Sequence, residues 1–331
     1  MSRRVVVAGN LSLDDTVSPD GAFMAAPGGD ALYASVGVRA WGLTPALLTL
    51  VGADYPAVYL ARIAAARVDV SHIRGTEGPT VHYRVTNRSD GTRLYEWLSS
   101  EDRLLLTSPE AADFGTASDG PLLGAAWLHV AAMPIEAQEV AVAAGRAAGV
   151  PVSLDPHEEY VAGFESRLAR LVEDVAFMPS ELEARLIFPD IDAADARAFG
   201  FAAAERLDDW RPSLVAVKLG ALGSVVRWGG RSTHLPAPVV PVVDSTGAGD
   251  AYCGGFIAGW LATESPEVAA ACGTVAAAET MAAFGAFSVD DAPSADERYK
   301  RVEELLGDAG FEGLDVALAQ LRDQLGIGSP A

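Results

Sequence analysis

The sequence predicts an α/β protein with a mainly parallel β-sheet and a small β-sheet lid. Short apolar runs alternate with longer Ala-rich helical stretches through most of the chain, which is typical of βαβ units. One stretch near residue 85 breaks this rhythm and alternates apolar with polar residues instead. With 331 residues, of which 50% are hydrophobic, the chain is long and apolar enough to bury a large core.

The expected strands and helices follow one another in that alternating order. Each expected strand is a short run of mainly apolar residues, as in a sheet that is buried on both faces. The helical stretches are longer and Ala-rich, and several end near Gly. The strands are expected at 5–9, 46–51, 126–130, 152–155, 175–178 and 214–219. The helices are expected at 30–41, 55–66, 135–148, 163–172, 180–187, 192–207, 250–262 and 266–284.

Two segments are expected to form the lid. Residues 80–97 alternate Val81, Tyr83 and Val85 with polar residues, and the turn 89–91 (Ser-Asp-Gly) predicts a hairpin. Residues 15–24, centred on Pro-Asp-Gly, predict a second hairpin in the same small sheet. The predicted lid therefore spans about 12–26 and 79–98. It belongs to a domain of residues 1–293, followed by a charged helical extension at 294–331.

Composition excludes several classes of partner and site. The formal net charge of −21 lacks the basic surface that nucleic acids require, so we expect no nucleic-acid partner. No apolar run reaches the roughly 18 residues of a membrane-spanning helix, and the N-terminus lacks a signal-peptide core, so we expect a cytoplasmic protein with no membrane partner. Five scattered histidines and two cysteines indicate neither a zinc site nor a disulfide framework.

The stretch from Asp244 to Asp250, Asp-Ser-Thr-Gly-Ala-Gly-Asp, carries the clearest chemistry. Gly247, Ala248 and Gly249 form a tight turn before an apolar helix, where backbone N–H groups and the helix dipole favour an anion. Asp250 then lies on the first helical turn, where its carboxylate can accept a proton from a hydroxyl that attacks a phosphate. The alternative is a Gly-rich loop with a helix cap and no ligand.

The whole string resembles the second signature of the ribokinase-like, or PfkB, carbohydrate and nucleoside kinase family. In that family Asp-Thr-Thr-Gly-Ala-Gly-Asp is followed by a small residue, an aromatic residue and a Gly pair; here Ser245 replaces one Thr, and Tyr252 and the pair at 254–255 complete the pattern. Residues of roughly 4–290 fit the family. The resemblance implies a three-layer α/β sandwich with a β lid, and an ATP- and Mg²⁺-dependent kinase with Asp250 as base.

The N-terminal part supports the same family. Asp14 follows the first strand, where open α/β sheets bind ligands, and a carboxylate suits contact with vicinal hydroxyls; the alternative is an ordinary turn aspartate. The resemblance implies that the substrate is bound by Asp14, Gly28, Gly29, Asp30 and Tyr33. Tyr33 stands where ribokinases carry Asn, which implies a different substrate.

Three further stretches resemble the nucleotide and metal site of these kinases. Residues 217–223 resemble a Val-Thr-x-Gly-x-x-Gly loop beneath ATP, with Lys218 in place of Thr. Residues 155–157 resemble an Asp-Pro-Asn segment with His157 in place of Asn, and 178–181 an Asn-x-x-Glu motif with Met178 in place of Asn. The implied nucleotide ligands are Lys218, Gly220, Gly223, Thr246 and Asp155. The implied metal ligands are Glu181 and Asp244, with K⁺ beside Asp244 as a second ion.

These observations predict a kinase that phosphorylates an alcohol group of a small polyol: a sugar, a nucleoside or a cyclitol. Met178 and His157 leave an alternative open, a ligand-binding or regulatory protein that keeps the fold with little or no turnover. An exposed small sheet would be a liability if left unpaired, and such lids often pair between subunits in the family, so we expect a homodimer.

Overall fold

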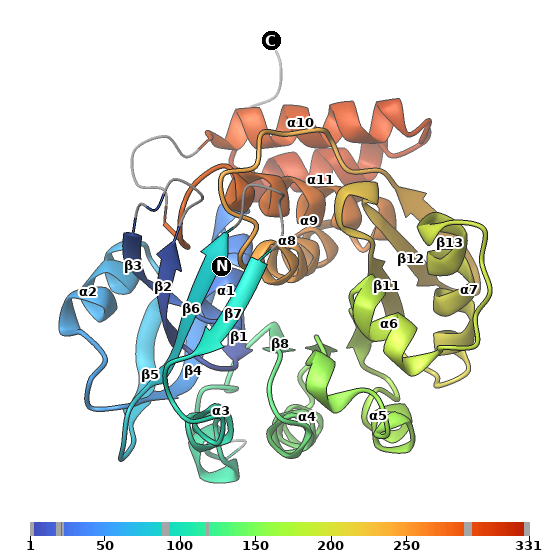
Figure 1. The fold of residues 1–331 in the computed structure, drawn as a ribbon. Helices are drawn as coiled ribbons and strands as arrows, with labels where there is room; N and C mark the ends of the chain where they lie inside the picture. Colours follow the sequence, from blue (N-terminus) through green and yellow to red (C-terminus); the bar gives the residue numbers. More distant parts are fainter. Residues whose placement is uncertain are drawn as a thin grey trace.

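The protein has two β-sheets, one large and one small, and Figure 1 shows them with helices on both sides of the large one. The computed structural model describes residues 3–17, 21, 23–87, 93–116, 119–287 and 293–327. The nine strands of the large sheet run in the order β13-β12-β11-β10-β9-β8-β1-β4-β5. The pairs from β11 through to β5 are parallel, while β12 and β13 join antiparallel at one edge. This confirms the predicted mainly parallel sheet.

The strands of the large sheet are short, and those in its centre are almost entirely buried, as their apolar sequences require. Their bounds are β1 (Arg4–Ala8), β4 (Thr44–Val51), β5 (Asp69–Gly75), β8 (Trp127–Val130), β9 (Val152–Leu154), β10 (Ala176–Phe177), β11 (Leu214–Lys218), β12 (Ser224–Trp228) and β13 (Arg231–Leu235). Three strands, β5, β12 and β13, were not predicted from the sequence. Of these, β5 and β13 are the edges of the sheet and contain several polar residues.

Helices cover both faces of the large sheet, so the hydrophobic core consists of two clusters, one on each side of the sheet. One face carries α1 (Asp30–Ala40), α2 (Ala57–Ala65), α8 (Ala248–Thr263) and α9 (Pro266–Met281), with α10 (Ala295–Asp308) and α11 (Asp315–Leu325) packed outside them. The other carries α4 (Ile135–Ala148), α5 (Glu165–Leu171), α6 (Glu181–Ile187) and α7 (Ala196–Asp208). A short helix, α3 (Arg103–Leu106), follows the small sheet. None of the described helices combines the length and hydropathy of a bilayer-spanning segment.

The small sheet is the predicted lid, with the order β3-β2-β6-β7. Its strands are β2 (Ser12–Val17), β3 (Phe23–Gly28), β6 (Val81–Asn87) and β7 (Arg93–Trp97). The two predicted hairpins meet because β2 pairs parallel with β6. The predicted turn 89–91 and the first two residues of the predicted turn Pro-Asp-Gly lie outside the described residues. Thr80, at the entry to β6, donates from both its amide and its hydroxyl to Asp54 at 2.7 and 2.8 Å, which anchors the lid to the body.

The C-terminal extension forms the two helices α10 and α11. Helix α10 begins with a capping box between Ser294 and Glu297. Its Arg298 donates to Glu279 of α9 at 2.8 Å, and Arg301 reaches the same carboxylate at 3.5 Å. These ion pairs fix α10 on α9. The division of the chain at residue 293 stays a prediction.

Candidate active site

The predicted site residues come together where the parallel strands of the large sheet end. Asp155 directly follows β9, and Lys218 is the last residue of β11. The N-termini of α1 and α8 bring Asp30 and Asp250 to the same region, because each residue lies on the first turn of its helix. Carboxyl ends of parallel strands meet at one edge of a sheet, which is where open α/β folds bind ligands.

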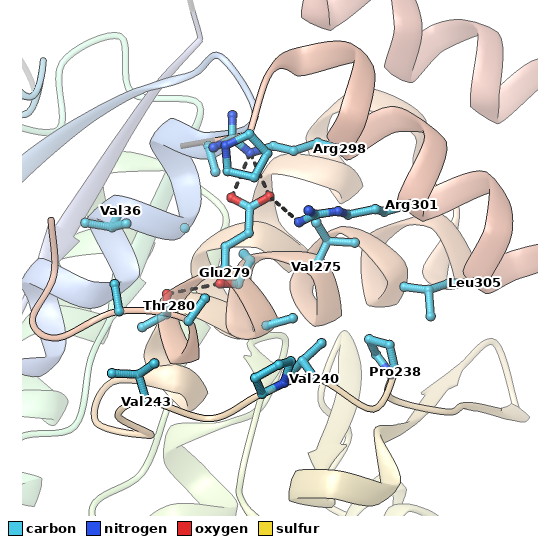
Figure 2. Close-up of a pocket in the computed structure, with 18 of the residues that line it drawn as sticks. Val36, Pro238, Val240, Val243, Val275, Glu279, Thr280, Arg298, Arg301 and Leu305 are labelled. Carbon is cyan, nitrogen blue, oxygen red and sulfur yellow. Dashed lines mark hydrogen bonds and ion pairs between the residues drawn. The ribbon is translucent and has the colours of Figure 1, made fainter. Parts of the chain in front are cut away.

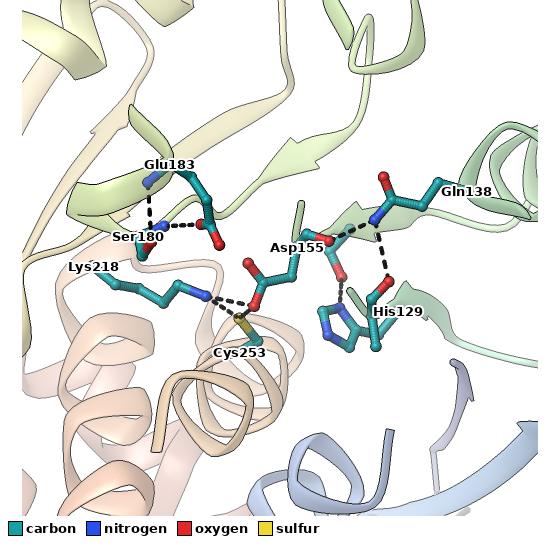
Figure 3. A network of polar contacts seen from close by, with 9 residues as sticks. His129, Gln138, Asp155, Ser180, Glu183, Lys218 and Cys253 are labelled. Atoms are coloured by element: carbon teal, nitrogen blue, oxygen red, sulfur yellow. Dashed lines mark hydrogen bonds and ion pairs between the residues drawn. The ribbon is translucent and has the colours of Figure 1, made fainter. Parts of the chain in front are cut away.

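Lys218 and Asp155 form a buried ion pair at the centre of this site, shown in Figure 3. Their Nζ and Oδ2 atoms lie 2.5 Å apart, and the Cys253 Sγ lies 3.4 Å from the same carboxylate oxygen. Burial alone would lower the pKa of Lys218, but Asp155 and the other acidic groups around it raise the pKa well above its usual value. Lys218 is therefore a fixed positive charge at neutral pH.

More carboxylates surround this ammonium than it can balance. Burial, with the charges of Asp155 and Asp14, raises the pKa of Asp30 to about 7. Burial and the charge of Asp155 likewise raise the pKa of Glu183 to about 7. The pKa of Asp250 is raised well above its usual value, first by burial and then by Asp30 and Asp155. Burial and mutual repulsion thus favour the protonated form of these carboxyl groups up to about neutral pH, so Lys218 is not faced by three full negative charges.

The N-terminus of α8 is built as the sequence predicts. Gly247 has φ of 72°, a left-handed conformation that favours Gly. The aromatic ring of Tyr33 packs against it, since a Cβ on Gly247 would come within 2.0 Å of the Tyr33 ring. The Ala248 N–H donates weakly to Ser245 O at 3.4 Å. A Cβ on Gly249 would lie 3.6 Å from Lys218 Nζ, so the first turn and the ammonium face the same space.

Before this turn, Asp244 is a structural anchor. Its Oδ1 accepts from the amide of Thr246 at 3.0 Å and from the Thr246 hydroxyl at 2.7 Å. Asp244 is buried, and its own N–H faces Met281 O at the end of α9. The side chain of Thr246 therefore holds the loop rather than pointing freely at a ligand.

Asp14 lies on the lid strand β2 and faces the site. The hydroxyl of Ser12 donates to its Oδ1 at 2.6 Å, and burial raises the pKa of Asp14 to about 6. Gly28, on the neighbouring strand, has no room for a side chain, because a Cβ would come within 1.8 Å of Asp14 Oδ2. Gly29 has φ of 104° and its backbone approaches Leu11 closely. Both glycines are needed to bring the lid and α1 together at Asp14.

The structure separates the predicted metal residue Glu181 from the charge cluster. Glu181 is partly exposed and forms an ion pair with Arg185 on the same helix at 2.7 Å. Glu183 is the acidic residue of α6 that lies near Asp155 and Lys218, and it forms a capping box with Ser180. Glu183 was not among the residues predicted from the sequence, although the Ser-x-x-Glu spacing of a capping box marks it as the residue that faces back towards Ser180.

Two departures from the family pattern, Met178 and His157, and the two glycines after β11 occupy different places. Met178 is completely buried in the core. His157 caps a short 3₁₀ turn, η2 (Glu158–Tyr160), where its Nδ1 accepts from the Glu159 N–H at 3.2 Å. Gly220 and Gly223 both have positive φ; a Cβ on Gly223 would come within 2.0 Å of Leu235 O, whereas Gly220 has open space around it. Gly220 thus lies open to a ligand above β11.

Gln138 of α4 supports Asp155 from below the site. Its Nε2 donates to the backbone oxygens of Asp155 at 2.8 Å and Ala131 at 3.3 Å, which ties the ends of β9 and β8 together (Figure 3). The 870 Å³ cavity in Figure 2 lies elsewhere, between α1, α9, α10 and the segment 238–243. It contains the Glu279 ion pairs and none of the predicted site residues.

The donor set fits a hard divalent cation. Asp155 Oδ1 is buried and has no hydrogen-bond partner among the described residues. Asp155, Glu183 and Asp250 supply only oxygen, the ligand type that Mg²⁺ prefers. Within the described part of the chain no three acidic, His or Cys side chains already converge as a cage. In phosphate-transfer sites Mg²⁺ is typically held by one or two carboxylates, and water and phosphate oxygens complete its shell.

Comparison with known proteins identifies the family. The family model for pfkB carbohydrate kinases matches residues 5–292. A cytidine kinase from Thermococcus kodakarensis is 28% identical over 293 residues, covering 86% of this chain and 98% of that protein. A fructokinase from Salmonella typhimurium is 27% identical over 279 residues, covering 80% and 87%.

A solved structure shows the same fold. The Escherichia coli ribokinase II crystallised with ATP and Mg²⁺ superposes with a TM-score of 0.73 at 19% identity, over 92% of this chain and all of that one. The fold is therefore that of the ribokinases, as the signature at 244–250 predicted. The chain belongs to the pfkB family of carbohydrate kinases, and it is a phosphotransferase that acts on alcohol groups.

Proposed function

We propose that the protein transfers the γ-phosphoryl group of ATP to a hydroxyl of a small polyol, either a sugar or a nucleoside. The observation that carries this proposal is the set of charged groups around Asp250. Its carboxylate is near enough to Asp30, Asp155 and Lys218 to feel their charges, and Asp30 in turn feels the charge of Asp14 on the lid. A carboxylate between a hydroxyl-binding edge and a phosphate-binding edge is placed for proton transfer between them.

The reaction follows from this placement. The hydroxyl oxygen of the substrate attacks the γ-phosphorus, and its proton passes to the carboxylate of Asp250. The bond between the γ-phosphorus and the β–γ bridging oxygen breaks, and ADP leaves. The N–H groups from Gly247 to Gly249 and the positive end of α8 stabilise the charge on the transferring group. Lys218 adds a fixed positive charge beside Gly249.

A divalent cation would be held by Asp155 and Glu183, whose oxygens face Lys218. When bound, it supplies charge neutralisation to the phosphate oxygens and orients them for in-line transfer. The chain is strongly acidic, so local features attract the nucleotide rather than the overall field. We also keep the expectation of a K⁺ ion near Asp244, which activity assays in K⁺ and Na⁺ buffers would test.

Asp250→Asn tests the assignment of the base. It keeps the shape of the first turn of α8 but cannot take up a proton at neutral pH. We expect turnover to fall by a factor of about 10² to 10⁴, with the affinity for ATP retained. Steady-state kinetics and calorimetry on the purified variant measure the two quantities. Full activity in the variant contradicts this role, and polyol binding without turnover in the wild type favours a binding protein on the same fold.

We further propose that the protein is a homodimer through the lid. The strands β3 and β7 are the edges of the four-stranded sheet, so each has a free row of backbone groups within the described residues. Phe23 and Met24 on β3 and Leu94 on β7 are exposed, Phe23 by 61%. Pairing of two lids would cover these side chains and the open edges.

A further inference from the structure

Three side chains form a row across the inner face of the lid. Asp14 on β2 is in register with Tyr83 on β6, and Tyr83 is in register with Trp97 on β7. Residues directly opposite each other on paired strands point to the same face of a sheet. Asp14 is buried and faces the site, as the charges around it show, so Tyr83 and Trp97 belong to the same face.

The two aromatic rings form a contiguous apolar surface beside Asp14. Their ring centroids lie 4.3 Å apart, with the rings tilted by 46°. Burial raises the pKa of the Tyr83 hydroxyl, and the negative charges of Asp30, Glu159 and Asp14 raise it further. Tyr83 is thus near enough to feel acidic residues of α1 and η2 as well as Asp14 of its own sheet.

Aromatic pairs between neighbouring strands are common in sheet packing and need no ligand. Here, however, both rings are only half-buried, whereas their neighbours on the same face of β6, Val81 and Val85, are buried. Each ring therefore keeps a surface that the core does not cover. A flat ring from a substrate can stack on that surface without displacing the core.

The distance from Asp14 to Trp97 also discriminates between substrates of different length. Adjacent strands lie about 4.8 Å apart, so the span from Asp14 to Trp97 across two strand spacings is about 10 Å. A free pentose or hexose is too short to contact both ends. A pentose joined to a flat heterocycle is long enough, with hydroxyls for the carboxylate and a π face for the aromatic rings.

We propose that the acceptor substrate is a nucleoside, whose ribose hydroxyls bind Asp14 and whose base stacks on Tyr83 and Trp97. This inference rests on the proposed kinase function and narrows its substrate from polyols in general. It makes the aromatic pair the determinant of specificity. We expect the pair to contribute to binding of the acceptor and not to the transfer step, because its rings contact the base and not the hydroxyl that is phosphorylated.

The test compares acceptors and variants. Purine and pyrimidine ribonucleosides are measured against free ribose and fructose, by ATP consumption and, separately, by calorimetric binding. The variants are Trp97→Leu and Tyr83→Leu, with Arg84→Ala as the matched control. Arg84 is next to Tyr83 on the opposite face of β6, where it pairs with Glu96 at 3.1 Å. Melting temperatures confirm that each variant is folded.

We expect at least one nucleoside to have a higher kcat/KM than either free sugar. Each aromatic variant should raise the KM for that nucleoside about ten-fold or more, with the KM for ATP unchanged and Arg84→Ala without effect. A free sugar that is turned over better than every nucleoside overturns the inference but leaves the kinase function standing. Nucleoside binding that depends on Trp97, without turnover of any acceptor, supports the substrate class and rejects the kinase function. Nucleosides that neither bind nor react overturn the inference.

Discussion

Neighbouring residues on β2 have separate roles because alternate side chains of a strand face opposite sides. Asp14 faces the site, next to Ser12 and Gly28. Asp15 faces away and lies 3.3 Å from the Nε2 of His82. The sequence offers two adjacent aspartates as candidates, and only the strand register decides between them.

Asp14→Ala should weaken acceptor binding alone. A carboxylate that accepts bonds from substrate hydroxyls contributes charged hydrogen bonds, so we expect the acceptor KM to rise by a factor of about 10 to 100. The KM for ATP should stay nearly constant. Asp15→Ala is the matched control and should leave both constants unchanged. Equal effects of the two substitutions would remove Asp14 from the substrate site.

The ionised side chain of Asp30 is expected to lower the stability of the ligand-free protein. Its pKa is about 7 in the folded state against an ordinary value of 3.8, so folding favours its protonated form. For such a group the folded state loses stability as pH rises from about 4 to about 7, and the full cost remains above that range. Asp30→Asn should therefore raise the melting temperature by a few degrees at pH 8 and by less at pH 5. A gain that is larger at pH 5 would contradict this explanation.

At the scale of elements, the close packing of α1 against α8 positions the two N-termini that form the site. Gly254 of α8 lies against the backbone of α1, where a Cβ would come within 1.9 Å of Ala34 O. Gly37 of α1 fits against Ala251 O in the same way. The Gly pair at 254–255 of the family signature thus serves helix packing, not the approach of a ligand.

Gly254→Ala should destabilise the protein by about 3 kcal/mol, because the backbone of α1 must move to make room for the methyl group. Gly307→Ala is the control. Gly307 lies in α10 with no heavy atom near its missing Cβ, so Ala there should stabilise by about 0.5–1 kcal/mol. Urea unfolding curves of both variants give the comparison. If Gly254→Ala lowers the free energy of unfolding no more than Gly307→Ala does, then α1 and α8 can separate without a measurable loss of stability.

At the scale of the whole molecule, assembly through the lid has a measurable consequence. A homodimer should show twice the mass of the 34.4 kDa chain by light scattering at micromolar concentration. Phe23→Asp places a charge in the proposed interface and should shift the mass towards a single chain. Val239→Asp, at an exposed residue of the body, is the control and should not. A wild-type mass of one chain rules out this assembly.

The sequence determined the fold and the centre of the site by itself. The alternation of apolar runs with helical stretches identified the parallel sheet, and the apolar–polar alternation of residues 80–97 identified the lid. Both patterns can be read from neighbouring residues, because a buried strand is apolar throughout and a half-buried hairpin alternates. The string from Asp244 to Asp250 identified the family, because the turn of Gly247 and the first helical turn are set by neighbouring residues. These features depend on a few consecutive residues.

Only the tertiary structure decided which distant residues share the site. The choice of Glu183 over Glu181 depends on which face of α6 packs towards Lys218, and two residues change that face completely. The position of Tyr33 against Gly247, and the row from Asp14 to Trp97, depend on contacts between segments far apart in the chain. Such contacts are fixed by strand register and helix packing, which no local pattern encodes.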